Sequence, residues 1–508
     1  MRVSVRATVA VAMLVAFYLL AVGLILGLLA AEVFVVFHTA ALAWITVGVV
    51  VLPAALALCA ALAAVERGVD EQLVGVPTTE SRQPELWALA AKIAHAVGTR
   101  VPDEIRIVDS AEICVSDTTS LLGLWVRRRR LYLGAPMLAG LTEQQVGADI
   151  AIALARSRAR GTRLAGTALA GRVALRRAHE AMEADRALKR LIRGALGGYA
   201  SAFRHLTDPI SRHQWLRADA AAARVVGSAV TESALRESAV VGVLWHRFVE
   251  DHLRDAWDAG YLPERVFDGF AEMRRAPELY VVLEHLRGQV TEDETADPHC
   301  PTAAVRVAAI REIAAPDDGV DRPAVDLVRD PVRTLDRAVM LAMVESADEK
   351  KRVDWPTLWH VGVRHRVREG TVRLLRAGAK ATGQRASLGA VLDALDADRL
   401  VALAPTDEGP GGADAGPRAR REFARDVVGR ELAHLVMLAY VDAGHGRWTR
   451  NWAGQTTLAT KRDDMIGLPG LAGVAVSDGG TTGLRESLAA AGVAVDFRPS
   501  RALPRTPR

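Results

Sequence analysis

The chain has 508 residues, too many for one ordinary domain, and half of them are hydrophobic, so it can bury a large core. Its 64 basic residues nearly balance its 60 acidic residues, for a net charge of +4, and this balance argues against nucleic acid as a partner. Three scattered cysteines, Cys59, Cys114 and Cys300, exclude a disulfide framework and a cysteine-type zinc site, and they are typical of a reducing compartment.

Two long apolar runs without charged residues open the chain, at residues 7–31 and 39–64. Each exceeds the roughly 20 residues that a helix needs to cross the ~30 Å hydrocarbon core of a bilayer. A cleaved signal peptide is the rival interpretation, but its apolar core would be only about 7–15 residues long. The sequence therefore predicts a transmembrane helical hairpin over residues 1–68.

Basic residues predict how this hairpin is oriented. Arg2 and Arg6 precede the first run and Arg67 follows the second, whereas the connecting segment 32–38 contains no Lys or Arg. Because positively charged flanks stay in the cytoplasm, both termini and the soluble remainder are predicted to be cytoplasmic. The excess of Arg over Lys, together with abundant Ala, Val, Leu and Gly, is typical of a GC-rich genome such as an actinobacterial one. The predicted location is therefore a bacterial inner membrane, with the lipid bilayer as one partner.

The soluble part begins with an amphipathic helix, Pro84–Val97, in which apolar residues recur at helical spacing. Arg127 to Arg130 are interpreted as a solvated hairpin turn, or alternatively as a contact with anionic lipid near the membrane anchor. Short β-type runs are expected on either side of this turn, at Glu104–Val108, Glu112–Val115, Leu121–Val126 and Leu131–Leu133.

Helical sequence dominates the rest of the chain. Thr142 and Gln145 form a capping-box pattern, which predicts the start of a helix that continues through Arg158. Further helices are expected at residues 209–226, 231–259, 263–275, 301–313, 355–379, 388–403 and 420–441.

The predicted fold class is therefore α+β and mostly helical, with a small sheet. Residues 405–418 are rich in Gly, Pro and Asp, which predicts a flexible linker. The predicted domains are the hairpin (1–68), a main domain (69–345), a helical region (346–404), the linker (405–418) and a small C-terminal α+β unit (419–508).

Three segments carry a family resemblance. LYLGAPMLAGLTEQQV, from Leu131, is similar to a lead-in to an H-E-x-x-H helix, and SRHQWLRADAAAARV, from Ser211, is similar to an E-x-x-A-D helix. DPHCPTAAVRVAAI, from Asp297, is similar to a late H-P-x-x-x-x-R-I-x-A-I segment. In this order, residues 84–313 resemble the soluble domain of HtpX-like and CAAX-prenyl-endopeptidase-like zinc metalloproteases of gluzincin type. The resemblance implies a gluzincin-like fold and leaves the tail beyond Asp354 without an assigned function.

The chemistry of such a site requires two His ligands four residues apart on one helix, a Glu general base and a carboxylate ligand from a second helix. In register with the resemblance, Ile152 and Arg156 take the two His positions and Ala153 takes the position of the general base. Trp215 replaces the carboxylate ligand, whereas Asp219 of the second motif is retained. We call these five residues the vestigial positions. No side chain at the ligand positions is a usual metal ligand, so zinc is expected to be absent and no catalytic residue is assigned.

The retained Asp219 needs a partner if it is buried. Arg156 lies one helical turn from Ile152 on the same face, so the sequence predicts that Arg156 pairs with Asp219 in place of the metal, with Trp215 packing beside them. Arg156 could alternatively reach solvent or Asp149.

Other histidines and carboxylates were weighed as metal ligands, and each set is more often surface or core. They are Glu431 with His434, His179 with Glu180 and Glu183, His360 with His365, and His246 with His252.

Two functions remain open from the sequence. The preferred one is a membrane-anchored, non-catalytic protein of metalloprotease-like fold that binds a protein or peptide partner, because strand addition needs only a sheet edge and pockets. The alternative is an active membrane-associated metallopeptidase or hydrolase with a relocated metal site.

Overall fold

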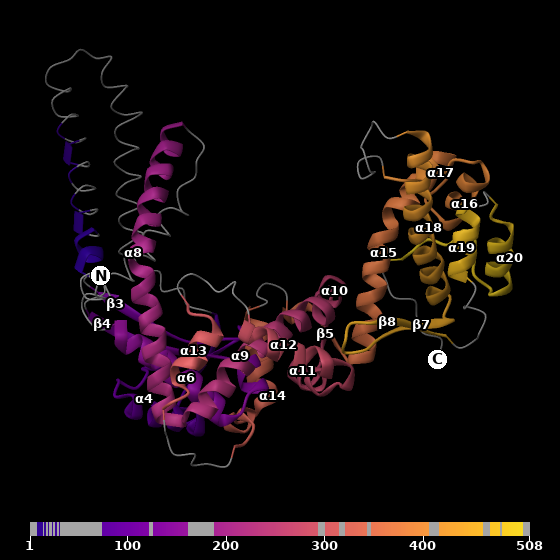
Figure 1. The fold of residues 1–508 in the computed structure, drawn as a ribbon. Coiled ribbons are helices and arrows are strands. Elements are labelled where there is room, and N and C mark those ends of the chain that lie inside the picture. The colour runs from indigo at the N-terminus through magenta and orange to yellow at the C-terminus, as the bar shows by residue number, and fades with distance from the viewer. Residues whose placement is uncertain are drawn as a thin grey trace. The chain divides into compact units, whose positions relative to one another are not determined.

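The chain divides into two compact units. The first unit comprises Met1–Trp245 with Tyr280–Val344, and the second comprises His246–Leu279 with Glu345–Arg508 (Figure 1). Residues 246–279, which the sequence assigned to the domain 69–345, thus belong to the second unit. The computed structural model describes scattered residues between 8 and 30, and then residues 74–120, 125–160, 187–292, 300–313, 321–342, 347–405, 416–460, 468–477 and 480–500.

The predicted membrane hairpin falls largely outside these residues. The predicted span 39–64 and the connecting segment 32–38 lie wholly outside them, and the predicted span 7–31 is described only in part. Within the part of the chain that the structure describes, no helix combines the length and the apolar character that crossing a bilayer requires.

The first unit contains a four-stranded mixed sheet. Its strands lie in the order β1-β2-β4-β3, where β2 and β4 are parallel and the two outer pairs are antiparallel. Ile105 and Ile107 of β2, like Leu131 and Leu133 of β4, are fully buried, because alternate residues of a strand share one face. The strands are β1 (Gly75–Thr78), β2 (Glu104–Val108), β3 (Ile113–Ser120) and β4 (Trp125–Gly134).

The arginine run lies inside β4, so the predicted turn at Arg127 to Arg130 is wrong. Arg129 and Arg130 are only 6% and 5% exposed. The Nε atom of Arg129 donates to Oδ1 of Asp117 at 2.8 Å, and the Nε atom of Arg130 donates to Oε2 of Glu104 at 3.1 Å. Burial opposes ionisation of Glu104, but hydrogen bonds from arginine side chains hold its pKa below the usual value. A buried strand can therefore carry these cations because acidic side chains neutralise them.

Helices pack against the sheet and against one another, with α6 on β3 and α14 on β1 and β2. The capping box that begins α6 is present: Thr142 N donates to Oε1 of Gln145 at 3.0 Å, and Gln145 N donates to Oγ1 of Thr142 at 3.3 Å. Besides short 3₁₀ turns, the helices of this unit are α4 (Pro84–Val97), α5 (Ala135–Gly140), α6 (Glu143–Arg160), α8 (Ala187–Val226), α9 (Ser228–Phe248), α12 (Tyr280–Glu292), α13 (Ala303–Ile310) and α14 (Pro331–Ala342).

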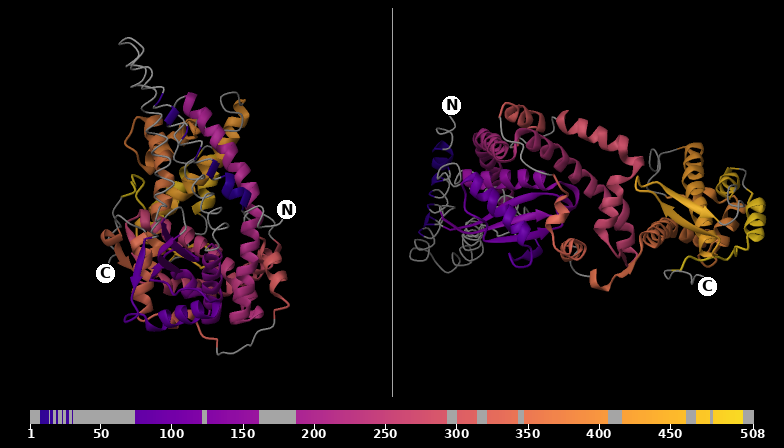
Figure 2. Two further views of the ribbon diagram at one scale, coloured as in Figure 1. Left: turned by 90° about the vertical axis from the view of Figure 1, so that its left-hand side faces the viewer. Right: turned by 90° about the horizontal axis from the view of Figure 1, so that it is seen from below.

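Helix α8 begins well before the predicted helix 209–226 and carries Pro209 in its interior. It extends beyond the other helices of its unit and runs beside the described N-terminal residues (Figures 1 and 2). Phe203 of α8 packs against Ala10, and the hydroxyl of Tyr199 donates to the carbonyl oxygen of Met13 at 2.6 Å. The first half of α8 thus provides the packing surface for the N-terminal segment.

The second unit is mostly helical and has two small two-stranded sheets, β5 with β6 and β7 with β8. The hairpin β7–β8, followed by two helices, makes the C-terminal region α+β. The elements are η2 (Val249–Leu253, a π-helical turn), α10 (Arg254–Asp258), β5 (Tyr261–Pro263), α11 (Val266–Arg275), β6 (Lys351–Val353), α15 (Trp355–Thr382), α16 (Leu388–Asp396), α17 (Leu400–Leu403), α18 (Pro417–Asp442), β7 (Gly446–Arg450), β8 (Thr456–Thr460), α19 (Leu468–Ser477) and α20 (Thr482–Ala490).

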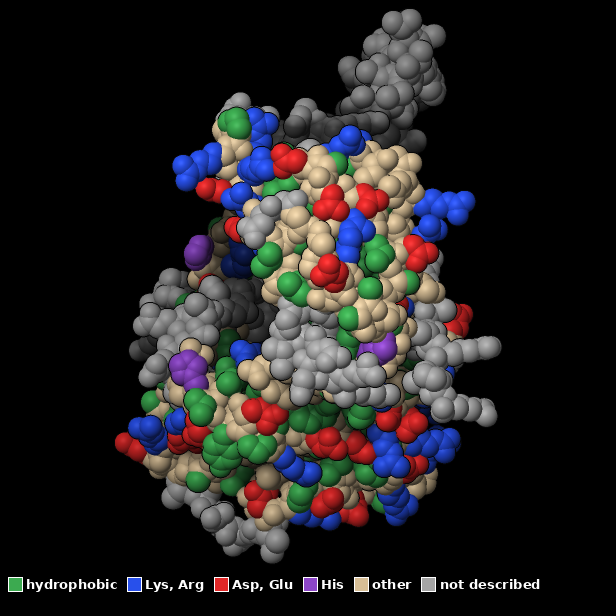
Figure 3. Space-filling model, turned by 90° about the vertical axis from the view of Figure 1, so that its right-hand side faces the viewer, with side chains coloured by type: hydrophobic (Ala, Val, Ile, Leu, Met, Phe, Trp, Pro, Cys, Tyr) green, Lys and Arg blue, Asp and Glu red, His purple; other side chains and the backbone are tan. Residues whose placement is uncertain are grey.

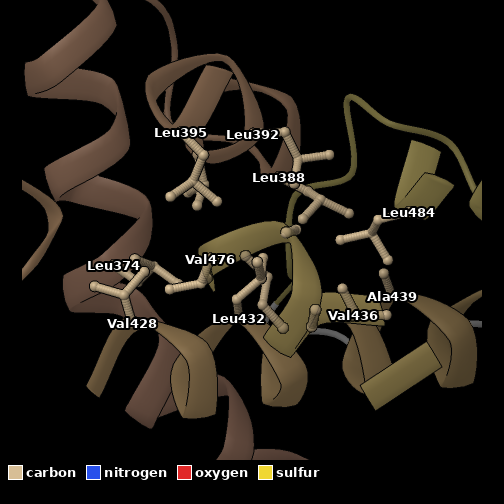
Figure 4. Close-up of a cluster of buried hydrophobic side chains, with 14 of the residues drawn as sticks. Leu374, Leu388, Leu392, Leu395, Val428, Leu432, Val436, Ala439, Val476 and Leu484 are labelled. Carbon is tan, nitrogen blue, oxygen red and sulfur yellow. The ribbon is translucent and has the colours of Figure 1, made fainter. Parts of the chain in front are cut away.

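The core of this unit lies between five of its helices. Figure 4 shows Leu374 of α15, Leu392 of α16, Val436 of α18, Val476 of α19 and Leu484 of α20 converging, and all five are buried. A buried ion pair supports the same packing, because the guanidinium of Arg364 on α15 binds both carboxylate oxygens of Asp442 on α18 at 2.7 Å.

A second cluster of this unit surrounds His252, which lies in η2. The His252 ring centroid is 5.9 Å from that of Phe248, 6.0 Å from Trp359 and 5.2 Å from Trp452. Its Nε2 atom lies 3.4 Å from the Trp452 carbonyl oxygen, and its buried Nδ1 atom has no hydrogen-bond partner among the described residues. Burial, reinforced by the positive charge of Arg450, lowers the pKa of His252 to about 4.

The close approach of α15 and α16 at Gly378 gives a first prediction. A Cβ atom at Gly378 would lie 3.0 Å from the backbone nitrogen of Val391, whereas one at Gly370 of the same helix would meet nothing within 4 Å. We expect Gly378→Ala to lower the free energy of unfolding by about 1–3 kcal/mol. Gly370→Ala is the matched control and should be neutral or stabilising by up to about 1 kcal/mol. Denaturant unfolding measures both variants, and hydrogen exchange of α15 and α16 gives the local readout. Equal changes in the free energy of unfolding for the two variants would contradict the close approach.

The neutral, buried His252 predicts acid sensitivity of the second unit. The ordinary pKa of His is 6.5 and that of folded His252 is about 4, so below pH 6.5 the unfolded chain binds a proton that the folded chain excludes. The contribution of neutral His252 to the free energy of unfolding is therefore fully present above pH 6.5. The free energy of unfolding falls by roughly 3 kcal/mol as the pH drops towards 4.

The variant His252→Leu removes this titration, because it replaces the imidazole by an apolar side chain of similar size. His360, whose pKa burial also lowers to about 4, keeps its own contribution in that variant. Urea unfolding at several pH values should therefore give a shallower acid dependence for His252→Leu than for the parent chain. Equal slopes would show that His252 does not titrate as expected.

Candidate functional site

The vestigial positions lie on two packed helices of the first unit. Ile152, Ala153 and Arg156 belong to α6, Trp215 and Asp219 belong to α8, and α6 packs along α8. Helix α13 packs against α8 as well. Residues spaced three or four apart are neighbours on a helix surface, so Ile152 and Ala153 each lie next to Arg156 on α6.

Asp219 is fully buried, and its charge is neutralised by Arg306 of α13. The Nε atom of Arg306 donates to Oδ2 of Asp219 at 2.9 Å, and an Nη atom donates to Oδ1 at 2.7 Å. Two parallel charge-assisted bonds of this kind are the strongest pairing that a carboxylate makes with a side chain. The sequence predicted Arg156 as the partner, and this is wrong: the ion pair that ties α8 to a second helix uses Arg306.

Arg156 instead lies over the indole of Trp215. The guanidinium carbon of Arg156 is 3.3 Å from the centroid of the Trp215 ring, and that of Arg306 is 4.5 Å from it. Both are cation–π contacts, in which the negative face of the ring attracts the positive charge. Trp215 therefore joins α6 and α13 through the two guanidinium groups. We call Arg156, Trp215, Asp219 and Arg306 the arginine–tryptophan junction.

The positions of the first ligand and of the general base belong to the hydrophobic core. Ile152 is 5% exposed and Ala153 is 7% exposed. Neither side chain has a lone pair for a metal, and Arg156 places a permanent cation beside them. Across the described ranges, no three His, Cys, Asp or Glu side chains gather closely enough to hold a metal ion.

Asp149 adds a titratable group beside the junction. It lies on α6 three residues before Ile152, and the Oγ atom of Ser238 on α9 donates to its Oδ2 atom at 2.6 Å. Burial raises the pKa of Asp149 to about 7, while the Ser238 hydrogen bond and the charge of Arg306 act in the opposite direction. The site can therefore hold or release one proton near neutral pH.

One residue after Arg156, α6 is also tied to the edge of the sheet. The Oγ atom of Ser157 donates to Oδ2 of Asp117 on β3, and the same carboxylate binds the guanidinium of Arg129 on β4. Ser157 is buried, so this contact holds α6 against β3 in a dry environment.

The other candidate ligands are dispersed. His179, Glu180 and Glu183 lie outside the described residues. Glu431 binds Arg373 at 2.5 and 3.1 Å, and burial lowers the pKa of His434. The Nδ1 atom of His360 accepts a hydrogen bond from the backbone of Trp448 at 3.2 Å, so it has a structural partner. His246 is exposed whereas His252 is buried, and His365 is half-buried.

Sequence reasoning gave Arg306 no role and named Asp149 only as an alternative partner of Arg156. Arg306 lies in the third quoted segment, where its Arg was part of the motif but received no role. Asp149 precedes Ile152, Ala153 and Arg156 at spacings of three, four and seven, so helical periodicity alone places it on their face.

Comparison of the chain with protein-family models, with curated proteins and with solved structures found no match. The family resemblance drawn from the three sequence segments therefore stays a prediction.

We expect the ion pair between Asp219 and Arg306 to contribute to the free energy of unfolding of the first unit. Arg306→Ala would leave a buried carboxylate without its counter-charge, so we expect the free energy of unfolding to fall by roughly 3–5 kcal/mol. Arg156→Ala removes a cation–π contact and should cost only about 0.5–2 kcal/mol. Arg311→Ala, an exposed residue just beyond α13, is the matched control and should be neutral. Denaturant unfolding measures all three variants.

A double variant separates charge from packing. Asp219→Leu with Arg306→Met replaces the ion pair by apolar side chains, and it should recover most of the stability that Arg306→Ala loses. A double variant as unstable as Arg306→Ala would show that an unpaired charge is not the cause.

Proposed function

We propose that this chain is a non-catalytic protein of the HtpX-like and CAAX-prenyl-endopeptidase-like metalloprotease fold, which binds an extended segment of a protein or peptide partner. The arginine–tryptophan junction is the observation that carries the proposal. Arg156 stands at a position that the resemblance gives to a metal-binding His, and it contacts Trp215, which stands at the position of the carboxylate ligand. Two permanent cations and an indole ring in this place disfavour a divalent metal ion.

The surface that fits such a partner is the outer edge of β3. In the described part of the sheet β3 has one strand neighbour, β4, to which it is antiparallel. Backbone groups along a strand edge can pair with an added peptide strand, and side-chain pockets beside it supply specificity. The contact of Ser157 with Asp117 holds this edge against α6, so a peptide added there would lie next to the helix that carries the vestigial positions.

We further propose that the two apolar runs at residues 7–31 and 39–64 anchor the chain in the bacterial inner membrane, with the folded units in the cytoplasm. Support comes from the described N-terminal residues, where Val15, Leu19 and Leu26 are 51%, 68% and 60% exposed. Several large apolar side chains left open to solvent on one segment favour burial in lipid or in another protein.

One experiment tests binding against catalysis. The full chain, extracted from washed membranes with detergent, is mixed with casein as an unfolded model polypeptide. We expect casein to bind without being cleaved, with no effect of a chelator and no stoichiometric zinc by metal analysis. Hydrogen exchange should show new protection of the amides of β3 (Ile113–Ser120), because strand addition engages backbone groups.

Strand β1 (Gly75–Thr78), at the other edge of the same sheet, is the internal control and should show no new protection. Protection at β1 alone, or nowhere, would refute the binding surface. Chelator-sensitive cleavage with zinc bound would instead establish the alternative, an active hydrolase with a relocated metal site.

A further inference from the structure

The first unit contains an open cavity of about 490 Å³ beside β1, at the edge of the sheet away from β3. Two segments far apart in the sequence form it: β1 with the turn that follows it before α4, and the start of α14 with the loop before it. The charged side chains at its wall are Arg82, Arg329, Asp330, Arg333 and Arg337. Four arginines against one aspartate leave a net charge of +3 around one cavity.

These arginines contrast with the paired arginines of the unit, such as Arg129, Arg236 and Arg287, each of which has an acidic partner. In the described part of the chain, the structure records no ion pair for Arg82, Arg329, Arg333 or Arg337, and all four are exposed. Arg322, only a few residues before them, pairs with Glu85 at 2.7 Å and with Glu143 at 2.6 Å. Acidic side chains thus neutralise an arginine nearby, whereas among the described residues no ion pair is recorded for the cavity arginines, even though Asp330 lies at the wall.

The spacing of these cations is unfavourable without a ligand. Arg333 and Arg337 are four residues apart on α14, so their side chains project from one face at a rise of about 6 Å. Like charges at this spacing destabilise a helix. An anion that lies between the guanidinium groups removes this repulsion.

The backbone around the cavity is held in place by a reciprocal amide contact. The Nε2 atom of Gln83 donates to the carbonyl oxygen of Arg329 at 3.0 Å, and the backbone nitrogen of Arg329 donates to Oε1 of Gln83 at 2.7 Å. Thr334 adds a hydrogen bond from its Oγ1 atom to the same carbonyl at 3.2 Å. The buried Gln83 therefore fixes the loop that carries Arg329 against the turn that carries Arg82.

We propose that this cavity binds an anion that carries two or more phosphate groups. Guanidinium groups match phosphate oxygens in planar, two-point hydrogen bonds, and several arginines around one cavity recognise several phosphates. Val76 and Pro77 of β1 give the cavity an apolar wall, which suits the non-phosphate part of the ligand. The ligand is either a free polyphosphorylated molecule or a lipid headgroup with two phosphates. The proposal does not depend on peptide binding at β3.

Tripolyphosphate is the soluble probe, titrated by calorimetry into the detergent-solubilised full chain. We expect binding that weakens with added salt and that weakens by about tenfold or more for each of Arg333→Gln and Arg337→Gln. Arg212→Gln, an exposed residue of α8 away from the cavity, is the matched control and should leave the affinity unchanged. Because the structure records no ion pair for the cavity arginines among the described residues, the variants should not lower the parent's unfolding temperature.

Vesicles distinguish the two sources of the phosphate groups. The parent chain and each variant are prepared in the same detergent. Their flotation with phosphatidylcholine vesicles is then compared in the presence and absence of cardiolipin. Cardiolipin-dependent flotation that Arg333→Gln and Arg337→Gln reduce assigns the site to a lipid headgroup, whereas tripolyphosphate binding without it assigns a soluble ligand. Failure of the parent chain to bind either probe would overturn the proposal. Equal losses in the cavity variants and in Arg212→Gln would overturn it too.

Discussion

The carboxylate of Asp219 has no exposed surface, and a buried carboxylate destabilises a fold unless donors and a counter-charge surround it. Arg306 meets this requirement from a helix that is 87 residues further along the chain. Because its guanidinium also lies over Trp215, neutralising the carboxylate fixes α13 and the indole together. Arg156 then stacks on the same ring, so the place of α6 follows from how one negative charge is satisfied.

The same pairing of arginine with carboxylate recurs where α6 meets the sheet. Asp117 on β3 binds Arg129 on β4 and accepts a hydrogen bond from Ser157 on α6. Two contacts made by neighbouring residues of α6, Arg156 to Trp215 and Ser157 to Asp117, thus connect the strand edge to the helical junction near the C-terminal end of this helix. A binding surface on such a connected frame loses little conformational entropy when a ligand arrives.

The arginines at the two edges of the sheet differ in burial and in whether an acidic side chain neutralises them. At β3 and β4 each buried guanidinium has an acidic partner, and burial without one would be costly. At β1 the arginines are exposed, so water solvates their charges and stability requires no acidic partner. Among the described residues, four cations without a recorded acidic partner thus lie together at an edge that solvent reaches, where a ligand could replace that solvent.

Local sequence determined α4 and the start of α6, but it did not predict the first half of α8. The apolar spacing of Pro84–Val97 matches α4 residue for residue, and Thr142 with Gln145 marks the start of α6, because caps and periodicity act within a few residues. It could not place Arg127 to Arg130, since four adjacent cations indicate solvent unless Glu104 and Asp117 lie beside them. Nor could it choose Arg306 over Arg156 for Asp219. Both choices depend on which side chains distant segments bring together, and only the tertiary structure decides that.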